Sequence, residues 1–406
     1  RLTAPQARLP RTDFFGANTR FREPSDGKRG TAIRASNALG RRAARPRLPP
    51  IGEYSLAGTC SAIHDGTAPQ VILGNGETLS SAYSRLQKLA GDQGGVLVVP
   101  WDVETVQCDS LRVARKRIMP GGVTIKGLTG PNGEQPRFYC RTEKRDGTIP
   151  HKEVVGRFMS FGDTRIDGEA APANQSVLVE NLHVDGYKTA FNLPRSGRIV
   201  LRNNYVHHQF NNAFVYSNLE WPSRLILEVC GNEVAHAGGY NSMHGFYLHR
   251  GLHPESSAEI VLVDNLCHST PFSSCFKSIA NKHVIKNNRF HQSLDTDPSY
   301  AKRYSSMLVD IAACADNLIE GNEFHGHKPE AKKYGDILVG IRNRKKIVKG
   351  CDRPPYGSDT FNDPDYWASL AGRKMFPTVI KGNSFTAGPD FGARLYACLL
   401  YTSPSP

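Results

Sequence analysis

The sequence of 406 residues contains no long apolar run, and none reaches the roughly 18 residues that a membrane-spanning helix needs. We therefore expect no transmembrane segment. The sequence also lacks a Cys-x-x-Cys pair, so its nine cysteines show no zinc-binding spacing. Four cysteines lie in or beside apolar strands and are expected to be buried thiols: Cys230, Cys267, Cys275 and Cys314. Four others lie outside these strands and could form disulfides: Cys60, Cys108, Cys140 and Cys351.

Acidic residues are scarce near the N-terminus, and this scarcity explains most of the net charge of +13. Residues 1–50 contain 12 Lys and Arg against 3 Asp and Glu, whereas the other 356 residues contain 39 against 35. The remainder of the chain is therefore close to neutral. A nucleic-acid-binding surface needs clustered positive charge on a folded domain, so we expect no nucleic-acid partner.

The two ends of the sequence differ in composition from the middle. Residues 1–60 are rich in Arg and Pro and have no hydrophobic periodicity, so we expect them to be disordered. The absence of an initiator Met and of an apolar signal segment suggests an incomplete reading frame. Residues 398–406 resemble a translated sequencing adapter, and we expect no reliable structure over residues 391–406. The folded domain is expected over residues 70–390.

A short pattern recurs through the middle of the chain: an apolar stretch, then Asn, any residue, and an apolar or aromatic residue. The pattern is centred on seven asparagines: Asn181, Asn204, Asn232, Asn265, Asn288, Asn322 and Asn383. Their spacings are 23, 28, 33, 23, 34 and 61 residues. A loose period of about 20–50 residues indicates stacked repeats, and no leucine-rich, ankyrin or tetratricopeptide consensus is present.

The repeat unit predicts strands, because its apolar and polar residues alternate with a period of two. Strands stacked one repeat above another must be parallel, and a unit of 23 residues is too short for a helical crossover. The sequence therefore predicts an all-β fold, a right-handed parallel β-helix. We expect each Asn to occupy a turn with left-handed dihedral angles and to hydrogen-bond to the Asn of the next coil.

The beginning of the folded part predicts a cap for this solenoid. Residues Thr78–Ala90 form an amphipathic helix with Leu79, Ala82, Tyr83, Leu86, Leu89 and Ala90 on one face, and Gly91 ends it. Strands are expected at 94–100 and 121–127. We expect residues 128–175 to leave the stack, and long insertions at 294–306 and 344–376. The helix expected at Thr78–Ala90 would cover the open end of the stack and so protect it from aggregation.

A second short strand is expected in each coil, with one apolar residue pointing inward: Phe191, Phe214, Phe246, Phe276, Val309 and Val339. Side chains alternate along a strand, so the next residue in each should point outward. The predicted outward column is Asn192, Val215, Tyr247, Lys277, Asp310 and Gly340. The last two alignments can slip by one residue, because each has two apolar candidates.

Three members of this column, Tyr247, Lys277 and Asp310, could perform β-elimination on a uronate polysaccharide. That reaction needs a base, an acid for the leaving oxygen and a stabiliser for the enolate-like anion. Lys277 could be the base if a neighbouring cation such as Arg250 or Lys282 made it easier to deprotonate. Tyr247 or His244 could be the acid. Asp310 could bind Ca²⁺, which prefers carboxylate oxygens.

Further residues are expected to bind the acidic polysaccharide, namely His249, Lys282 and the basic segment that begins at Arg342. A solvated outer face also accounts for Lys, Tyr and Asp, because the outside of a β-helix must be polar somewhere. Five histidines follow the Asn turns: His207, His208, His236, His268 and His325. We interpret them as turn residues and not as metal ligands, because none has a metal-like partner set in the sequence.

The pattern resembles that of the pectin-lyase-like superfamily of parallel β-helix proteins, with its PbH1 repeats, over about residues 70–390. Two segments carry the resemblance furthest: 244–250, His-Gly-Phe-Tyr-Leu-His-Arg, and 276–290, which contains Lys277-Ser278 and an Asn-Asn turn. The second is similar to chondroitinase-B-like and alginate-lyase relatives, where the Lys is the base. The resemblance thus implies that role for Lys277. Those relatives carry Arg-His-Gly on the next coil, where this chain has Asp310.

These observations favour a secreted polysaccharide lyase, in an extracellular or periplasmic location, that acts on an acidic polysaccharide, with Ca²⁺ as a possible cofactor. A C5-epimerase shares the proton abstraction and stays open. A glycoside hydrolase would need paired carboxylates about 5–10 Å apart, and the column supplies only Asp310. A non-catalytic carbohydrate-binding protein, such as an adhesin- or spike-like β-helix, is the alternative outside the enzymes. The sequence gives no oligomeric state.

Overall fold

The computed structural model describes residues 59–108, 110–113, 119–140, 156–161, 176–193, 197–217, 224–237, 244–249, 257–270, 274–279, 282–291, 309–311, 317–325, 337–340, 379–386 and 393–396. The chain divides into one unit over residues 1–52 and a second over 53–406, and the described residues all belong to the second. Most of the expected disordered segment, and the expected insertions at 294–306 and 344–376, therefore lie outside the described residues.

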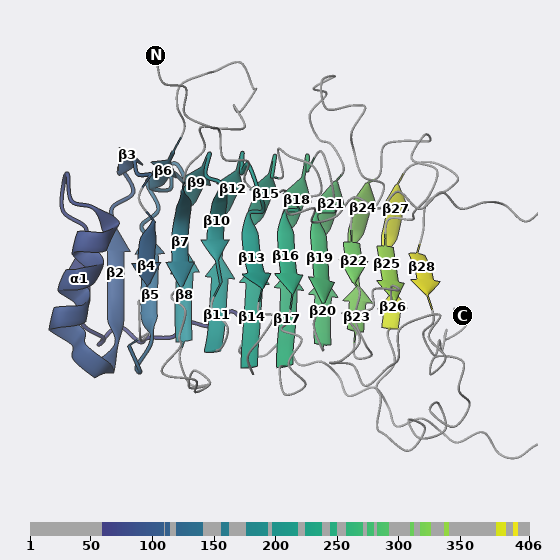
Figure 1. Cartoon of the computed structure of the whole chain (residues 1–406), viewed down its shortest axis with the longest axis horizontal. Coiled ribbons are helices and arrows are strands. Elements are labelled where there is room, and N and C mark those ends of the chain that lie inside the picture. The colour runs from purple at the N-terminus through teal and green to yellow at the C-terminus, as the bar shows by residue number, and fades with distance from the viewer. Residues whose placement is uncertain are drawn as a thin grey trace, which may run out of the picture. The chain divides into compact units, whose positions relative to one another are not determined.

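The second unit is an all-β solenoid of three parallel sheets, with one α-helix among the described residues (Figure 1). Sheet A contains β1 (Gln70–Ile72), β2 (Gly95–Val99), β5 (Val123–Gly127), β8 (Ser176–Glu180), β11 (Gly197–Arg202), β14 (Arg224–Cys230), β17 (Ser257–Val263), β20 (Lys282–Lys286), β23 (Asn317–Glu320) and β26 (Val379–Lys381).

The other two sheets have nine strands each. Sheet B contains β3 (Glu104–Val106), β6 (Arg137–Tyr139), β9 (His183–Asp185), β12 (Tyr205–His207), β15 (Glu233–Ala235), β18 (Leu266–His268), β21 (Arg289–His291), β24 (Glu323–His325) and β27 (Ser384–Thr386). Sheet C contains β4 (Leu111–Val113), β7 (Arg157–Phe161), β10 (Thr189–Asn192), β13 (Phe214–Ser217), β16 (Phe246–His249), β19 (Phe276–Ile279), β22 (Val309–Ile311), β25 (Ile337–Gly340) and β28 (Ala393–Tyr396).

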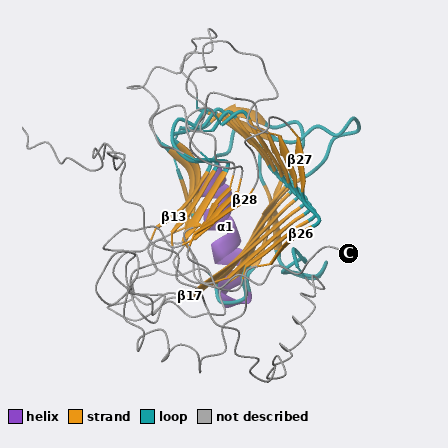
Figure 2. Ribbon diagram, turned by 90° about the vertical axis from the view of Figure 1, so that its right-hand side faces the viewer, coloured by secondary structure: helices purple, strands orange, loops and turns teal. Residues whose placement is uncertain are grey.

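Each coil passes from sheet A to sheet B to sheet C, and the strands pair only with those of neighbouring coils (Figure 2). The predicted parallel β-helix is confirmed, as are both predicted strands of each later coil. The third strand, in sheet B, was not predicted, because three residues are too few to show a period. The expectation that residues 128–175 leave the stack is wrong for 137–139 and 157–161, because β6 and β7 pair in register with β9 and β10. Residues 141–155 and 162–175 lie outside the described residues. The stack also continues to Tyr396, past the expected end at residue 390.

The predicted helix is α1 (Leu79–Ala90), which begins where the Thr78 hydroxyl accepts a hydrogen bond from the Ser81 amide at 3.2 Å. It ends at Gly91, whose φ of 54° is favourable for glycine; the short 3₁₀-helix η1 (Gly91–Gln93) follows. Leu79 and Leu86 are fully buried against the first strands of the solenoid. Leu89 is 61% exposed, so its predicted place on the buried face is wrong.

At the corner between sheets A and B, two consecutive residues share the work predicted for a single Asn. One residue adopts the left-handed conformation, and the next makes the hydrogen bond to the neighbouring coil. The residues in the left-handed position have φ between 53° and 65°. They are Asn181, Asn203, Gly231, Asp264, Asn287, Gly321 and Gly382. The next residue forms the asparagine ladder, which runs through Asn204, Asn232, Asn265, Asn288, Asn322 and Asn383. Asn181 therefore belongs to the left-handed column, and Leu182 pairs with the ladder at Asn204.

The interior is filled by side chains stacked from coil to coil. Phe191, Phe214 and Phe246 of sheet C lie nearly parallel, with ring centroids 5.2 and 4.6 Å apart. Phe290 and Phe324 of sheet B stack at 5.3 Å. These rings are fully buried, and their stacking fixes the register of the strands that bear them.

The outer face of sheet A is partly covered by the segment that precedes β1. Cys60 is buried there with Leu178 and Val200, and Ile63 packs against them. Cys60 forms a disulfide with Cys230, while Cys108 pairs with Cys140. Cys267 and Cys275 are buried thiols as predicted, whereas the prediction for Cys230 is wrong, because Cys230 is only partly buried and is bonded to Cys60. Cys314 and Cys351 lie outside the described residues.

Candidate functional site

The predicted outward column on sheet C is confirmed over its central coils. Asn192 pairs with Val215, Val215 with Tyr247, Tyr247 with Lys277, and Lys277 with Asp310. The last member is Leu338 and not Gly340, because Val309 pairs with Ile337. The slip is two residues, and it follows from the three successive apolar residues of β25. Tyr247, Lys277 and Asp310 thus follow one another on three rungs that span about 10 Å, since neighbouring strands lie about 4.8 Å apart.

Tyr247, Lys277 and His244 form one cluster. The Lys277 Nζ lies over the Tyr247 ring, 5.8 Å from its centroid, which is a cation–π arrangement. The His244 ring stacks on the same tyrosine, with centroids 5.4 Å apart and planes 9° apart. His244 is only 3% exposed, and its backbone amide donates to the Asn212 side chain at 2.6 Å. The buried imidazole therefore supports the phenol ring, while Tyr247 and Lys277 are partly exposed.

The other predicted site residues are distributed as follows. His249 ends β16 and pairs with Ile279, two residues from Tyr247 on the same strand. Lys282 begins β20 of sheet A, where it pairs with Glu259, so it lies on a different sheet from Lys277. Only the backbone positions of His249, Lys282 and Asp310 are described. Arg250 and Arg342 lie outside the described residues.

A buried polar group lies directly behind this column. Ser278 is the inward neighbour of Lys277, and its hydroxyl lies 2.7 Å from His283 Nε2. The other ring nitrogen, Nδ1, lies 2.6 Å from the Asn317 side-chain oxygen. All three residues are buried, and burial lowers the pKa of His283 to about 4. His283 is thus a neutral core residue that joins sheets A and C and is not available to a substrate.

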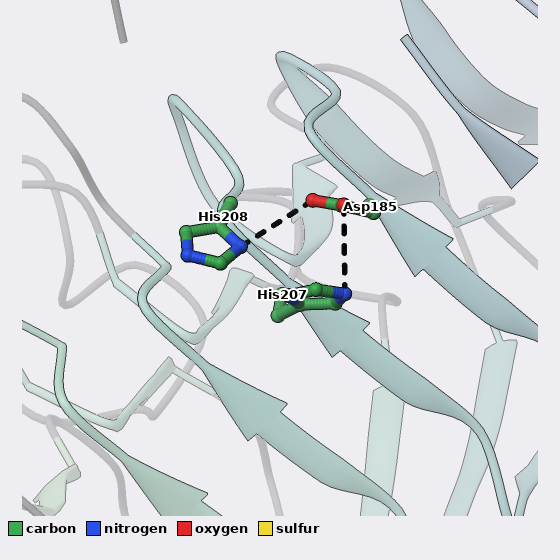
Figure 3. Close-up of side chains that lie close together, drawn as sticks. All are labelled: Asp185, His207 and His208. Carbon is green, nitrogen blue, oxygen red and sulfur yellow. Dashed lines mark ion pairs between the residues drawn. The ribbon is translucent and has the colours of Figure 1, made fainter. Parts of the chain in front are cut away.

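A second cluster of polar side chains, missed in the sequence, lies on sheet B. Asp185 ends β9, His207 ends β12, and His208 follows it (Figure 3). Their ligand atoms all lie within 4.8 Å of one another. The Asp185 Oδ1 is 3.4 Å from His208 Nδ1, and Oδ2 is 3.8 Å from His207 Nε2. We call these three residues the Asp185 cluster.

The environment of the Asp185 cluster is partly buried and includes a cation. The Asp185 side chain is 1% exposed, and Arg137 on the preceding coil donates to its Oδ2 at 2.8 Å. This contact raises the pKa of Arg137. The His183 Nε2 contacts the His207 Nε2, and burial, together with Arg137, lowers the pKa of His183 to about 4. A third imidazole, neutral at neutral pH, therefore lies beside the cluster.

A third group on sheet B also brings possible metal ligands together: His291, Glu323 and His325. The rings of His291 and His325 stack at 4.0 Å with planes 16° apart. Glu323 is about half exposed and pairs with Arg289 at 3.1 Å. His291 and His325 occupy the same position of the sheet B strands as His207 and His268 in earlier coils.

The premise that these histidines lack a metal-like partner set is wrong for His325, which lies beside His291 and Glu323, and for His207 and His208, which lie beside Asp185. Their partner, Asp185, comes from the preceding coil, so no local motif shows it. Alignment of Asn181 with Asn204 places Asp185 opposite His208, whereas the true register places it opposite His207. Alignment of the buried valines would have given the correct register, because Val184 pairs with Val206 and thereby places Asp185 opposite His207.

Comparison of the chain with protein-family models, with curated proteins and with solved structures finds no match. The fold and the site geometry therefore carry the functional argument. Among the helices that the structure describes, none is long and apolar enough to cross a membrane.

Proposed function

We propose that this chain is a carbohydrate-active parallel β-helix protein that cleaves an acidic, uronate-containing polysaccharide by β-elimination on sheet C. The observation that carries the proposal is the contact of Lys277 with the face of Tyr247 on adjacent rungs. A base and an acid separated by one rung can reach the same sugar unit. The three all-parallel sheets also support the resemblance to the pectin-lyase-like superfamily.

In the proposed reaction, Lys277 removes the proton from the carbon α to the uronate carboxylate. The electron pair of that C–H bond forms a carbon–carbon double bond, and the glycosidic oxygen leaves the neighbouring carbon. Tyr247 donates its hydroxyl proton to this oxygen. The ammonium formed on Lys277 is stabilised by the Tyr247 ring. His244 is too buried to reach a polymer, so the proposal assigns proton donation to Tyr247 and positioning to His244.

The Ca²⁺ that the resemblance implies does not fit the column as it stands. Ca²⁺ takes about six to eight oxygen ligands, whereas the described register of sheet C supplies one carboxylate, Asp310, beside the amine of Lys277. We therefore derive no step through this ion, and a Ca²⁺ requirement stays a prediction for measurement. The two disulfides support an oxidising compartment, and so the proposed extracellular or periplasmic location.

The experiment that tests the proposal is ultraviolet detection of unsaturated uronate products from alginate, pectate and chondroitin or dermatan sulfate, with and without Ca²⁺. The wild type should form product on one of them. Lys277→Ala should abolish the reaction, and Tyr247→Phe should lower kcat by about 100-fold or more, the usual loss for a general acid. Lys126→Ala, which removes an exposed lysine of sheet A, should leave the rate unchanged.

Other outcomes would replace parts of the proposal. Product formation that survives Lys277→Ala would keep the lyase activity and reject this site. Retention of the wild type on immobilised polysaccharide without product would favour the non-catalytic binding protein. Inversion at the α-carbon without cleavage, detected by NMR, would favour a C5-epimerase. Cleavage without a double bond would indicate a hydrolase.

A further inference from the structure

We propose that Asp185, His207 and His208 form a binding site for a divalent transition-metal ion such as Zn²⁺, on sheet B and separate from the column on sheet C. Two imidazoles and one carboxylate are a ligand set that zinc and neighbouring transition metals favour. The harder ions Ca²⁺ and Mg²⁺ prefer sites made of oxygen ligands alone. The inference does not depend on the proposed function.

The distances within the Asp185 cluster suit a small tetrahedral ion. Zinc lies about 2.0–2.1 Å from its nitrogen and oxygen ligands, so the ligand atoms themselves lie about 3.4 Å apart. The distance from His208 Nδ1 to Asp185 Oδ1 is 3.4 Å, and that from His207 Nε2 to Asp185 Oδ2 is 3.8 Å. These two distances involve different oxygens of Asp185, and His207 Nε2 also contacts His183 Nε2. The three ligand atoms lie within 4.8 Å of one another, so binding of one ion requires the imidazole of His207 to turn from His183 toward the carboxylate.

The backbone explains how two consecutive residues face the same carboxylate. Neighbouring side chains on a strand point in opposite directions. His208 has a φ of 53°, in the left-handed region that a residue with a side chain rarely adopts. This turn brings its ring next to that of His207, with centroids 4.6 Å apart and planes 56° apart. Tilted rings can direct their nitrogen lone pairs toward a common point.

The group of His291, Glu323 and His325 is a poorer candidate for the same chemistry. Its two imidazoles are stacked with nearly parallel planes, so their in-plane lone pairs run side by side and do not converge. Its carboxylate is about half exposed and is held by Arg289. In the Asp185 cluster, by contrast, the carboxylate is buried and two rings approach it from different directions.

The surroundings of Asp185 orient it for this role. Arg137 holds Oδ2, which directs Oδ1 toward His208. Such outer contacts fix metal-ligating groups in other sites, although the positive charge of Arg137 should also moderate the affinity. His207 is buried, whereas the His208 side chain is 34% exposed, so an ion could enter from the His208 side. Because the ligands come from two consecutive coils, an ion should also stabilise the stack.

The test is to add Zn²⁺ to chelator-treated, tag-free protein. Isothermal titration calorimetry measures the affinity, and thermal denaturation with and without Zn²⁺ measures the melting temperature. Wild type should bind Zn²⁺ and melt at a higher temperature when it is bound. His208→Asn should weaken binding at least about tenfold and remove the rise in melting temperature. Asn suits this position, because Asn181 and Asn203 adopt similar φ angles in this chain. Circular dichroism would show that the variant is folded.

The matched control is His236→Asn, the same substitution at the equivalent position of the next coil. His236 has a φ of 51° and stacks on His208 at 4.8 Å, but it does not belong to the Asp185 cluster. It should keep Zn²⁺ affinity within about threefold of wild type. The proposal would be overturned by wild-type protein that shows no Zn²⁺ binding, by unchanged affinity in His208→Asn, or by loss of binding in His325→Ala instead.

Discussion

At the residue scale, a side chain in this solenoid is defined by its coil neighbours as much as by its neighbours in sequence. The ladder asparagines show this most clearly. The Asn265 side chain accepts from the Asn232 backbone amide at 2.9 Å and donates to the Asn288 Oδ1 at 2.8 Å. It also donates to the Val229 carbonyl of the preceding coil at 2.8 Å. One residue thus satisfies buried groups on three coils.

His283 predicts how stability depends on pH. Its folded pKa of about 4 lies below its ordinary value of 6.5, so the unfolded chain takes up the proton first as the pH falls. Stability should therefore decrease between about pH 6.5 and pH 4, by up to about 3 kcal/mol from this group. His283→Gln cannot titrate, so urea midpoints measured from pH 7.5 to 4.5 should fall less steeply than in wild type.

His183 and His291 have pKa values lowered in the same direction, so part of the slope should remain in that variant. If the urea midpoint of His283→Gln fell with pH as steeply as that of the wild type, the prediction would be wrong. His283 would then have the same pKa in the folded and unfolded chains.

At the element scale, the segment before β1 acts as a strap across the outer face of sheet A. The Cys60 backbone amide donates to Glu228 at 2.5 Å, and the Cys60 carbonyl accepts from Arg202 at 2.8 Å. Glu228 also pairs with Arg198 at 2.7 Å. The strap explains why Leu178 and Val200 are buried on a face that a β-helix usually exposes.

The strap predicts unequal effects of the two disulfides. Cys60–Cys230 joins residues 170 positions apart, whereas Cys108–Cys140 joins residues 32 positions apart. Loop-closure entropy gives about 5 kcal/mol for the first and about 4 kcal/mol for the second. Cys60→Ser should therefore lower the melting temperature more than Cys108→Ser, because it also releases the strap. An equal or smaller loss would show that the other contacts of the strap hold it without the bond.

At the scale of the whole molecule, the solenoid has one apolar end that α1 closes (Figure 1). Without this helix, the fully buried Leu97 and Val99 of β2 would lie at an open end of the stack. Exposed strands and apolar surface at such an end promote association between molecules. The helix thus covers the apolar interior of the first coil.

Two leucines of α1 test this role of the helix. Leu86 is fully buried, whereas Leu89, three residues later, is 61% exposed. Leu86→Asp should detach the cap and produce aggregates in size-exclusion chromatography, because it places a charge in the core. Leu89→Asp should elute as the wild type does. Aggregation of both variants would attribute the effect to the added charge and not to the loss of the cap.

Much of the fold could be predicted from the sequence, because stacked coils repeat their pattern. Apolar alternation and the asparagines predicted sheets A and C, and with them the register of Tyr247 and Lys277. Sheet B was missed because each of its strands has three residues. The Asp185 cluster was missed because Asp185 and the two histidines come from different coils, so no local motif joins them. The strap was beyond prediction, because no local pattern links Cys60 to Cys230.

The side-chain amides of the asparagine ladder are all oriented in the same direction along the solenoid, so their dipoles are aligned. Each side-chain amide donates through Nδ2 to the Oδ1 of the following coil, at 2.8–3.0 Å from Asn204 through to Asn383. The orientation cannot reverse, because each Oδ1 also accepts a backbone amide from the coil before it. Successive backbone amides of a strand point alternately toward the preceding and the following coil, so their dipoles largely cancel along the stack. The ladder amides each donate to the asparagine of the following coil, so their dipoles add. The corner is therefore a polar axis along the stack, with its positive end toward the last coil.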